Sequence, residues 1–392
     1  MIGPILMSSP DLTEAEMAAV TQVLSSRYLS LGPQVESFER LFASYIGTTQ
    51  AVAVNSGTSG LHLCVIATGA GEGDEVITTP FSFVSSANCI LFERARPVFV
   101  DIRPDTLCLD PARIEEAITS RTRAILAVDV FGQPADYDPI REIADRHNLP
   151  VIEDACEAIG AEYRGRKAGT LGDVAVFAFY PNKQMTTGEG GMIVTDNVAW
   201  AGLFRSLRNQ GRDVFDGWLN HVRLGYNYRL DELSAALGVA QLGRIEELLS
   251  KRERVAGWYN ERLQGIEGVC TPSIAPTTTR MSWFVYVVRF RPPLKRDQIL
   301  AALKARGIPS RPYFTPIHLQ PFYVQKFGYK RGDFPQAEAA GDSCLALPFS
   351  SVMTEEQVDC VCSILEEIVA EEQRGGKGGV MERYRERETR SG

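Results

Sequence analysis

A lysine and an aspartate stand at a spacing that suits one kind of chemistry. Asp154 ends the predicted strand that contains Val151 and Ile152, and Lys183 follows 29 residues later, inside the Gly- and Thr-rich segment 179–191. An acid at the end of a buried strand can hold a protonated pyridine nitrogen, and an amine in a confined loop can bond an aldehyde. The pair indicates a pyridoxal 5'-phosphate site. The alternatives are a helix cap or ion pair for Asp154 and a plain turn around Lys183.

A second segment is suited to binding phosphate. Residues 55–60 (Asn-Ser-Gly-Thr-Ser-Gly) follow an apolar run and precede a predicted helix at 61–68, so their amides and hydroxyls converge at a helix N-terminus. The segment lacks both the Gly-Lys-Ser/Thr of a nucleotide-hydrolysing loop and the GxGxxG dinucleotide fingerprint. A capped strand-to-helix turn without a ligand would have the same composition.

Two further residues are candidates with open alternatives. Phe83, in the run 80–84, could stack on an aromatic cofactor or could be an ordinary core residue. His318 lies in the polar and aromatic loop 313–319, where it could bond a substrate or fill a structural role. No second metal ligand stands near it, so we expect no metal site.

The segments around these residues predict an α/β fold with a mostly parallel sheet. Short apolar runs alternate with helix-length segments between residues 50 and 200, as crossover units do. The predicted strands are Ala51–Val54, Glu75–Thr78, Pro97–Val100, Ala124–Val130, Pro150–Glu153, Val174–Phe179 and Met192–Thr195. Capping signals at Thr13 and Asp110 mark the starts of two helices.

The C-terminal part reads as a smaller α+β domain. Long helical material from 230 to 263 leads to a strand at 283–290, a helix at 296–306 and a last helix that begins at Thr354 with a capping box. We place the large domain at 1–255 and the small domain at 256–373. The basic, Gly-rich segment 374–392 is predicted to be a disordered tail.

Composition limits the partners. A net charge of -8 over 392 residues argues against nucleic acid binding. No apolar stretch approaches the ~18 residues that span a bilayer, and no signal peptide is evident, so a cytoplasmic protein without a membrane partner is expected. The eight cysteines lie scattered in apolar segments, where reduced core residues are typical.

With these residues in place, the chain closely resembles the DegT/DnrJ/EryC1/StrS family of sugar aminotransferases, which have the type I fold of pyridoxal phosphate-dependent transferases. The resemblance extends from about Thr13 to Glu371. It is carried by the stretches Leu29–Pro33 with Val35 and Phe38, Asn55–Ser59, Glu153–Ala161, Tyr180–Gly191 and Gly225–Leu230.

The resemblance implies a role for each matching position. Lys183 would form the Schiff base with the cofactor and then act as acid and base, while Asp154 would hold the ring nitrogen. Gly57, Thr58 and Ser59 would bind the phosphate, and Phe83 would stack on the ring. Asn227 would reach the phosphate of a neighbouring subunit, which implies a homodimer with shared active sites. Tyr313 and His318 fall where the family contacts its sugar nucleotide.

Two positions depart from the family pattern. Many members have a serine five residues before the lysine, where this chain has Ala178. Many have Gln or His three residues after the aspartate, near the phenolic oxygen of the cofactor, where this chain has Glu157. An ionised Glu157 would repel a phenolate, so we expect it to bind a proton or to turn away.

The expected reaction is transfer of an amino group from an amino acid, glutamate in most of the family, to a keto group on a nucleotide-linked hexose, for amino-sugar or polysaccharide synthesis. One alternative is sugar dehydration on the same fold, but the related dehydratases replace the lysine with histidine. The other is a non-catalytic regulatory member. Neither the sugar nor its keto position follows from the sequence.

Overall fold

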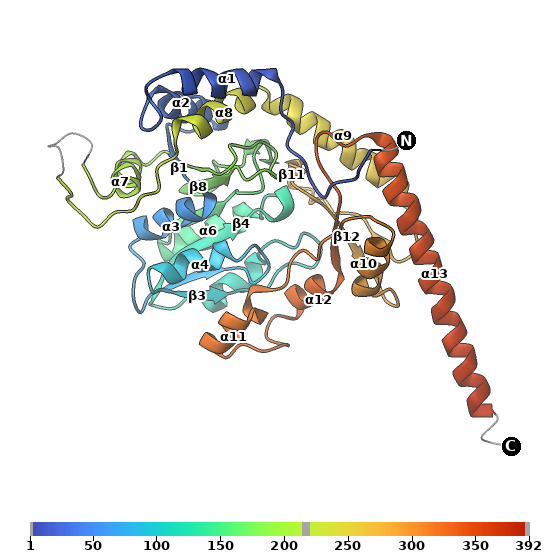
Figure 1. The fold of residues 1–392 in the computed structure, drawn as a ribbon. Coiled ribbons are helices and arrows are strands. Elements are labelled where there is room, and N and C mark those ends of the chain that lie inside the picture. The colour runs from blue at the N-terminus through green and yellow to red at the C-terminus, as the bar shows by residue number, and fades with distance from the viewer. Residues whose placement is uncertain (1–2, 214–219, 389–392) are drawn as a thin grey trace.

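The computed structural model describes residues 3–213 and 220–388, with side chains described to Arg374. A seven-stranded sheet has the order β1-β9-β8-β5-β4-β2-β3 (Figure 1). Its strands are β1 Gln50–Val54, β2 Glu75–Thr78, β3 Arg96–Phe99, β4 Thr122–Val128, β5 Val151–Asp154, β8 Val174–Ala178 and β9 Gly191–Thr195. Only β9 runs against the others, because its pairings with β1 and β8 are both antiparallel and the remaining pairings are parallel. The predicted α/β class and all seven predicted strands are confirmed.

Helices cover both faces of this sheet. They are α1 Glu14–Ser25, α2 Pro33–Ile46, α3 Gly57–Ala67, α4 Ser85–Phe92, α5 Ile114–Ala117, α6 Tyr137–His147, α7 Val198–Arg208, α8 Glu232–Gly243 and α9 Ile245–Leu263, with 3-10 turns at Pro111–Arg113 and Val130–Gly132. Figure 1 shows α1, α2 and α8 gathered on one side of the β1 end, with α3 on the other side.

The alternation of side chains along the strands explains this sandwich. In β1, Ala51 and Ala53 join the core beneath α2 and α8, whereas Val52 and Val54 pack on the other side with α3. In β8, Phe177 faces the α2 side and Val176 faces α3. Such strands bury both faces, which is why their sequences are nearly continuous apolar runs.

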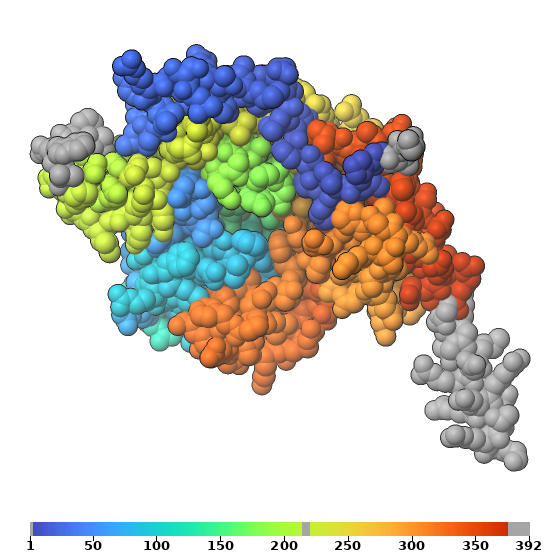
Figure 2. Space-filling model, viewed as in Figure 1, coloured from blue at the N-terminus to red at the C-terminus, as the bar shows by residue number. Residues whose placement is uncertain are grey.

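The C-terminal part of the chain has its own antiparallel sheet, in the order β10-β12-β13. Its elements are β10 Val269–Cys270, β12 Tyr286–Phe290, β13 Cys344–Leu347, α10 Arg296–Ala305, α11 Pro321–Phe327, α12 Pro335–Ser343 and α13 Glu355–Glu388, with a 3-10 turn at Ile317–Leu319. A third sheet joins β11 Thr278–Arg280, β6 Glu162–Tyr163 and β7 Arg166–Lys167. Figure 2 shows the orange and red C-terminal segments toward the right and bottom of the view, with a dark blue N-terminal segment lying against them on the right.

Some element bounds differ from the predictions for local reasons. Helix α3 begins at Gly57 rather than Leu61, because Ser56 caps it by accepting a hydrogen bond from the Ser59 amide. The helical stretch after Leu230 is two helices, since Arg244 has non-helical backbone angles. The capping boxes at Thr13 and Thr354 are present. The backbone of α13 continues to Glu388, through most of the segment predicted as a tail, and residues 389–392 lie outside the described residues.

Candidate active site

A cavity of about 560 Å³ lies at the carboxyl edge of the large sheet. Open parallel sheets bind ligands at this edge, because strand ends and helix N-termini meet there. The cavity wall combines the ends of β5 and β8, the first turn of α3, the segment before α4 and the loop that follows β8. It contains seven of the residues selected from the sequence, namely Gly57, Thr58, Phe83, Asp154, Glu157, Lys183 and Tyr313.

Asp154, the last residue of β5, is held by two donors and is only 4% exposed. The Ser86 hydroxyl donates to Oδ2 at 2.7 Å, and the Cys156 amide donates to Oδ1 at 3.2 Å. The Ser82 and Ser86 hydroxyls are 2.8 Å apart. The aspartate is therefore fixed in place at the cavity wall and suited to a cationic partner.

Lys183 reaches the cavity from a tightly bonded loop. The Thr186 hydroxyl and the Thr187 amide both donate to the Phe179 carbonyl, and the Lys183 amide donates to the Tyr180 carbonyl. The Lys183 side chain is 12% exposed, and its Nζ lies 3.8 Å from the centre of the Phe284 ring. The amine is thus confined against an aromatic face rather than solvated.

Glu157 turns into the cavity and not away from it. Its Oε1 lies 3.6 Å from Lys183 Nζ, and its Oε2 accepts a hydrogen bond of 2.9 Å from the Phe131 amide. Burial raises the pKa of Glu157, against the opposing effect of Lys183. Of the two outcomes expected from the sequence, the structure favours a carboxyl with raised proton affinity.

The start of α3 packs closely against the ends of β5 and β8. A side chain on Gly57 would come within 2.8 Å of both the Ala178 Cβ and the Cys156 Sγ, so glycine is required for this approach. The Thr58 hydroxyl lies 2.8 Å from the Ser85 hydroxyl, which also lines the cavity. Hydroxyls of α3 and α4 thus gather beside Ala178, which has none.

Three sequence candidates do not line the cavity. Ser59 is buried and donates to Asn55 Oδ1. Asn227 is exposed, and its carbonyl accepts from Asn55 Nδ2 at 3.4 Å. His318 is fully buried, with Nε2 3.1 Å from Glu338 Oε1, and this placement favours the structural alternative for that histidine. Phe83 is 61% exposed, so the core alternative for Phe83 is wrong.

Other residues of the site were not selected from the sequence. Ser86 follows Ser82 by four residues, a spacing that places both on one side of a helical turn, and this signal could have identified it. Phe284 comes from the distant segment before β12, and no local pattern connects it to Lys183.

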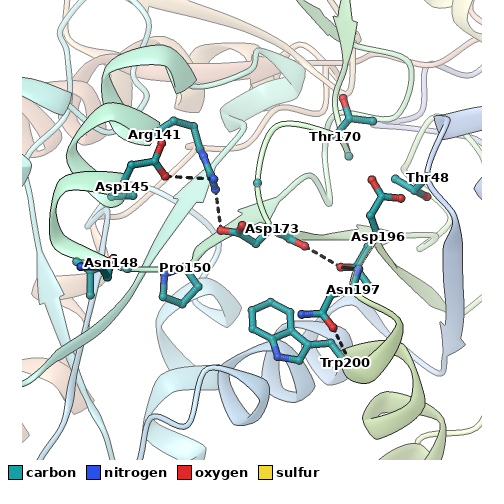
Figure 3. Close-up of a pocket in the computed structure, with 15 residues that line it drawn as sticks. Thr48, Arg141, Asp145, Asn148, Pro150, Thr170, Asp173, Asp196, Asn197 and Trp200 are labelled. Carbon is teal, nitrogen blue, oxygen red and sulfur yellow. Dashed lines mark hydrogen bonds and ion pairs between the residues drawn. The ribbon is translucent and has the colours of Figure 1, made fainter.

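A second cavity, of about 690 Å³, lies at the opposite, amino edge of the sheet (Figure 3). Its charged groups are occupied with one another. Arg141 pairs with Asp173 and Asp145, and Asp173 also accepts from the Val151 amide. Asn197 caps α7 through the Trp200 amide. Polar groups that hold the fold in this way do not converge on a ligand, so the first cavity is the candidate active site.

Within the described residues, no group of three or more His, Cys, Asp or Glu side chains is arranged to hold a metal ion. A search of the same residues found no helix with the length and apolar character to cross a membrane. All eight cysteines are free thiols.

Comparison with known proteins identifies close similarity over nearly the whole chain. A sequence model of the DegT/DnrJ/EryC1/StrS aminotransferase family matches residues 10–366. The GDP-perosamine synthase of Caulobacter vibrioides is 43% identical over 369 residues, covering 93% of this chain and 98% of the relative.

Solved structures show the same similarity. DesV of S. venezuelae superposes with a TM-score of 0.87 at 37% identity, covering 94% of this chain and 99% of DesV. A sugar aminotransferase, Spr1654 of Streptococcus pneumoniae, solved in its PMP form, gives a TM-score of 0.89 at 27% identity, covering 94% of this chain and 99% of Spr1654.

Proposed function

Because the chain belongs to the DegT/DnrJ/EryC1/StrS aminotransferase family, we propose that it transfers the amino group of an amino acid, L-glutamate, to a keto group of a nucleotide-linked hexose. The observation that carries the proposal is that Asp154 and Lys183 line the same cavity. The name of the relative from Caulobacter vibrioides, GDP-perosamine synthase, supports a nucleotide sugar as the acceptor.

The residues of the cavity fit pyridoxal 5'-phosphate, the cofactor implied by the family. The volume of about 560 Å³ is in the range of cofactor sites. One wall carries the fixed carboxylate of Asp154 and another the confined amine of Lys183. The close approach of Gly57 to Ala178 places the first turn of α3 at the cavity, with the Thr58 and Ser85 hydroxyls beside it.

When bound, this cofactor withdraws electrons from the substrate carbon that carries nitrogen, so that a proton can leave it and return elsewhere. Asp154 holds positive charge at the ring nitrogen, because an ionised carboxylate favours the protonated ring. Lys183 would supply the amine that holds the cofactor and would hold or move a proton at Nζ. Gly57 and Thr58 would bind the phosphate, and Phe83 would cover the ring.

Glu157 and Ala178 would make this site differ from that of many relatives. With its pKa raised by burial, Glu157 can hold a proton toward the phenolic oxygen of the cofactor. Because Ala178 has no hydroxyl, phosphate binding would depend more on Thr58 and Ser85. Their hydroxyl oxygens are 2.8 Å apart.

A homodimer is part of the proposal. Tyr226 and Tyr228 stack on each other at 5.0 Å and pack on His62, while Asn227 between them is exposed. Leu224, just before this segment, is 84% exposed. The exposed Asn227, held by the two packed tyrosines and close in sequence to the exposed Leu224, is suited to contact a neighbouring subunit. The family pattern for Asn227 implies the same contact.

The test is direct. Purified protein would be incubated with pyridoxal 5'-phosphate, L-glutamate and a panel of keto nucleotide sugars, with 2-oxoglutarate and amino-sugar nucleotides measured by mass spectrometry. We expect both products in equal amounts with at least one acceptor, and neither with Lys183→Ala. The exposed Lys304 on α10 provides the matched control, because Lys304→Ala removes an amine far from the cavity lining. Unchanged turnover in Lys183→Ala would exclude the proposal.

A further inference from the structure

Arg252 is a buried cation on α9 whose hydrogen bonds reach two segments that are far apart in the sequence. Arg252 is only 1% exposed. Nη2 donates to the carbonyls of Asn182 at 3.3 Å and Lys183 at 2.7 Å. Nη1 donates to the carbonyls of Trp283 at 3.3 Å and Phe284 at 3.1 Å. One guanidinium therefore ties α9 to the Lys183 loop and to the segment that enters the small-domain sheet.

Burying the Arg252 guanidinium costs free energy, which indicates that its contacts serve a function. No carboxylate pairs with Arg252 among the residues that the structure describes, and its Nε is buried without a hydrogen-bond partner. Burial lowers the pKa of Arg252 to about 10. Burying an unpaired charge is unfavourable unless its protons are bonded, so the four carbonyls are what keep the guanidinium in place. In return, it satisfies carbonyls that would otherwise lack donors.

The two tied segments are the ones that hold the Lys183 amine. The first includes the backbone of Lys183 itself, and the second includes Phe284, whose ring centre lies 3.8 Å from Lys183 Nζ. A second hydrogen bond links the same two segments, since Gln184 Nε2 donates to the Ser282 hydroxyl at 2.7 Å. A shift of either segment would therefore change where Nζ lies in the cavity.

We propose that Arg252 is a positioning residue for Lys183: it fixes the Lys183 backbone and the Phe284 ring together, so that the amine faces the cavity only when the two domains are correctly docked. The inference rests on the proposed function for the role of the amine. A small displacement of a reacting group slows the reaction strongly, but it need not weaken substrate binding.

The experiment compares Arg252→Met and Arg252→Lys with Tyr259→Phe in the full-length protein. Tyr259 is a matched control, because it is fully buried on the same helix and its hydroxyl donates to the Pro348 carbonyl at 2.7 Å without touching the Lys183 loop. Four quantities would be measured: the rate at which cofactor-free protein takes up pyridoxal 5'-phosphate, the pH midpoint of the visible absorbance of the loaded protein, kcat and KM.

For Arg252→Met we expect uptake and kcat at least about 10-fold lower, a shifted pH midpoint and unchanged KM values. Arg252→Lys should recover part of the loss, since an ammonium can still donate to some of the carbonyls. Tyr259→Phe should lower the unfolding temperature and leave the other quantities unchanged. If Arg252→Met does not fold, Arg252→Lys decides by the same criteria.

Uptake, kcat and pH midpoint equal to wild type in a folded Arg252 variant would overturn the proposal, as would equal losses in Tyr259→Phe. Should the wild-type protein itself take up no pyridoxal 5'-phosphate, the proposed function fails. The position of the amine would then be read from the labelling rate of Lys183 by trinitrobenzenesulfonate in cofactor-free protein. A changed rate in Arg252→Lys but not in Tyr259→Phe supports the inference, and equal rates in all three proteins overturn it.

Discussion

Ser86 donates a hydrogen bond of 2.7 Å to Asp154, from the first turn of α4 to the end of β5. Both residues are almost fully buried. The relationship matters because the proposed chemistry needs the Asp154 carboxylate in the correct orientation, and a hydroxyl donor to one of its oxygens fixes that orientation.

Removing the donor should therefore weaken the role of Asp154. A hydrogen bond to a charged group contributes about 1.5–3 kcal/mol, so we expect Ser86→Ala to lower kcat about 10-fold and to lower the free energy of unfolding by about 1–3 kcal/mol. Ser343→Ala, which removes a half-buried hydroxyl at the end of α12, is the control. Steady-state kinetics and denaturant titration measure both effects. An unchanged kcat in Ser86→Ala would show that the function of Asp154 does not depend on the hydrogen bond from Ser86.

Asp154→Asn keeps the shape of the side chain and removes its charge. We expect the variant to bind pyridoxal 5'-phosphate but to turn over at least about 10-fold more slowly, because a neutral partner no longer favours a protonated ring nitrogen. Equilibrium binding of the cofactor and kcat would be measured on the same preparation. Normal turnover would remove Asp154 from its assigned role.

Glu157 predicts a particular dependence of stability on pH. Burial raises its folded-state pKa above the ordinary value of 4.5, so the folded protein keeps this proton at pH values where the unfolded chain has lost it. The contribution of Glu157 to stability therefore falls as pH rises above 4.5. Glutamine does not titrate, so the unfolding temperature of cofactor-free Glu157→Gln should gain on wild type as pH increases from there. A difference that is constant with pH would contradict the raised pKa.

Asn227 can be tested by complementation. If it acts in the site of a neighbouring subunit, a mixed dimer of Lys183→Ala and Asn227→Ala has one site with both residues intact, although each parent dimer is impaired. We expect co-purified mixed dimers, isolated through two different affinity tags, to recover about half of wild-type activity per dimer. Activity no higher than that of the parent proteins would place Asn227 in its own subunit's site, or in none.

The sequence predicts most of the sheet because its strands are buried on both faces and read as apolar runs between Gly, Pro and Asp. It also predicts that Asp154 and Lys183 meet, since the ends of neighbouring parallel strands share one edge. It could not predict Phe284 or Arg252, because their contacts with the Lys183 loop depend on how the small domain docks. The sequence leaves both roles of His318 open, since only the fold reveals that Glu338 holds it in the interior.

The proposed function depends most on Lys183 as the residue that binds the cofactor. Its most direct test is to add pyridoxal 5'-phosphate to the purified protein, reduce with borohydride, digest, and locate the phosphopyridoxyl group by peptide mass spectrometry. We expect one modified peptide, the one that contains Lys183, and its loss in Lys183→Ala but not in Lys304→Ala. A label spread over exposed lysines, or concentrated on a lysine other than Lys183, would contradict it.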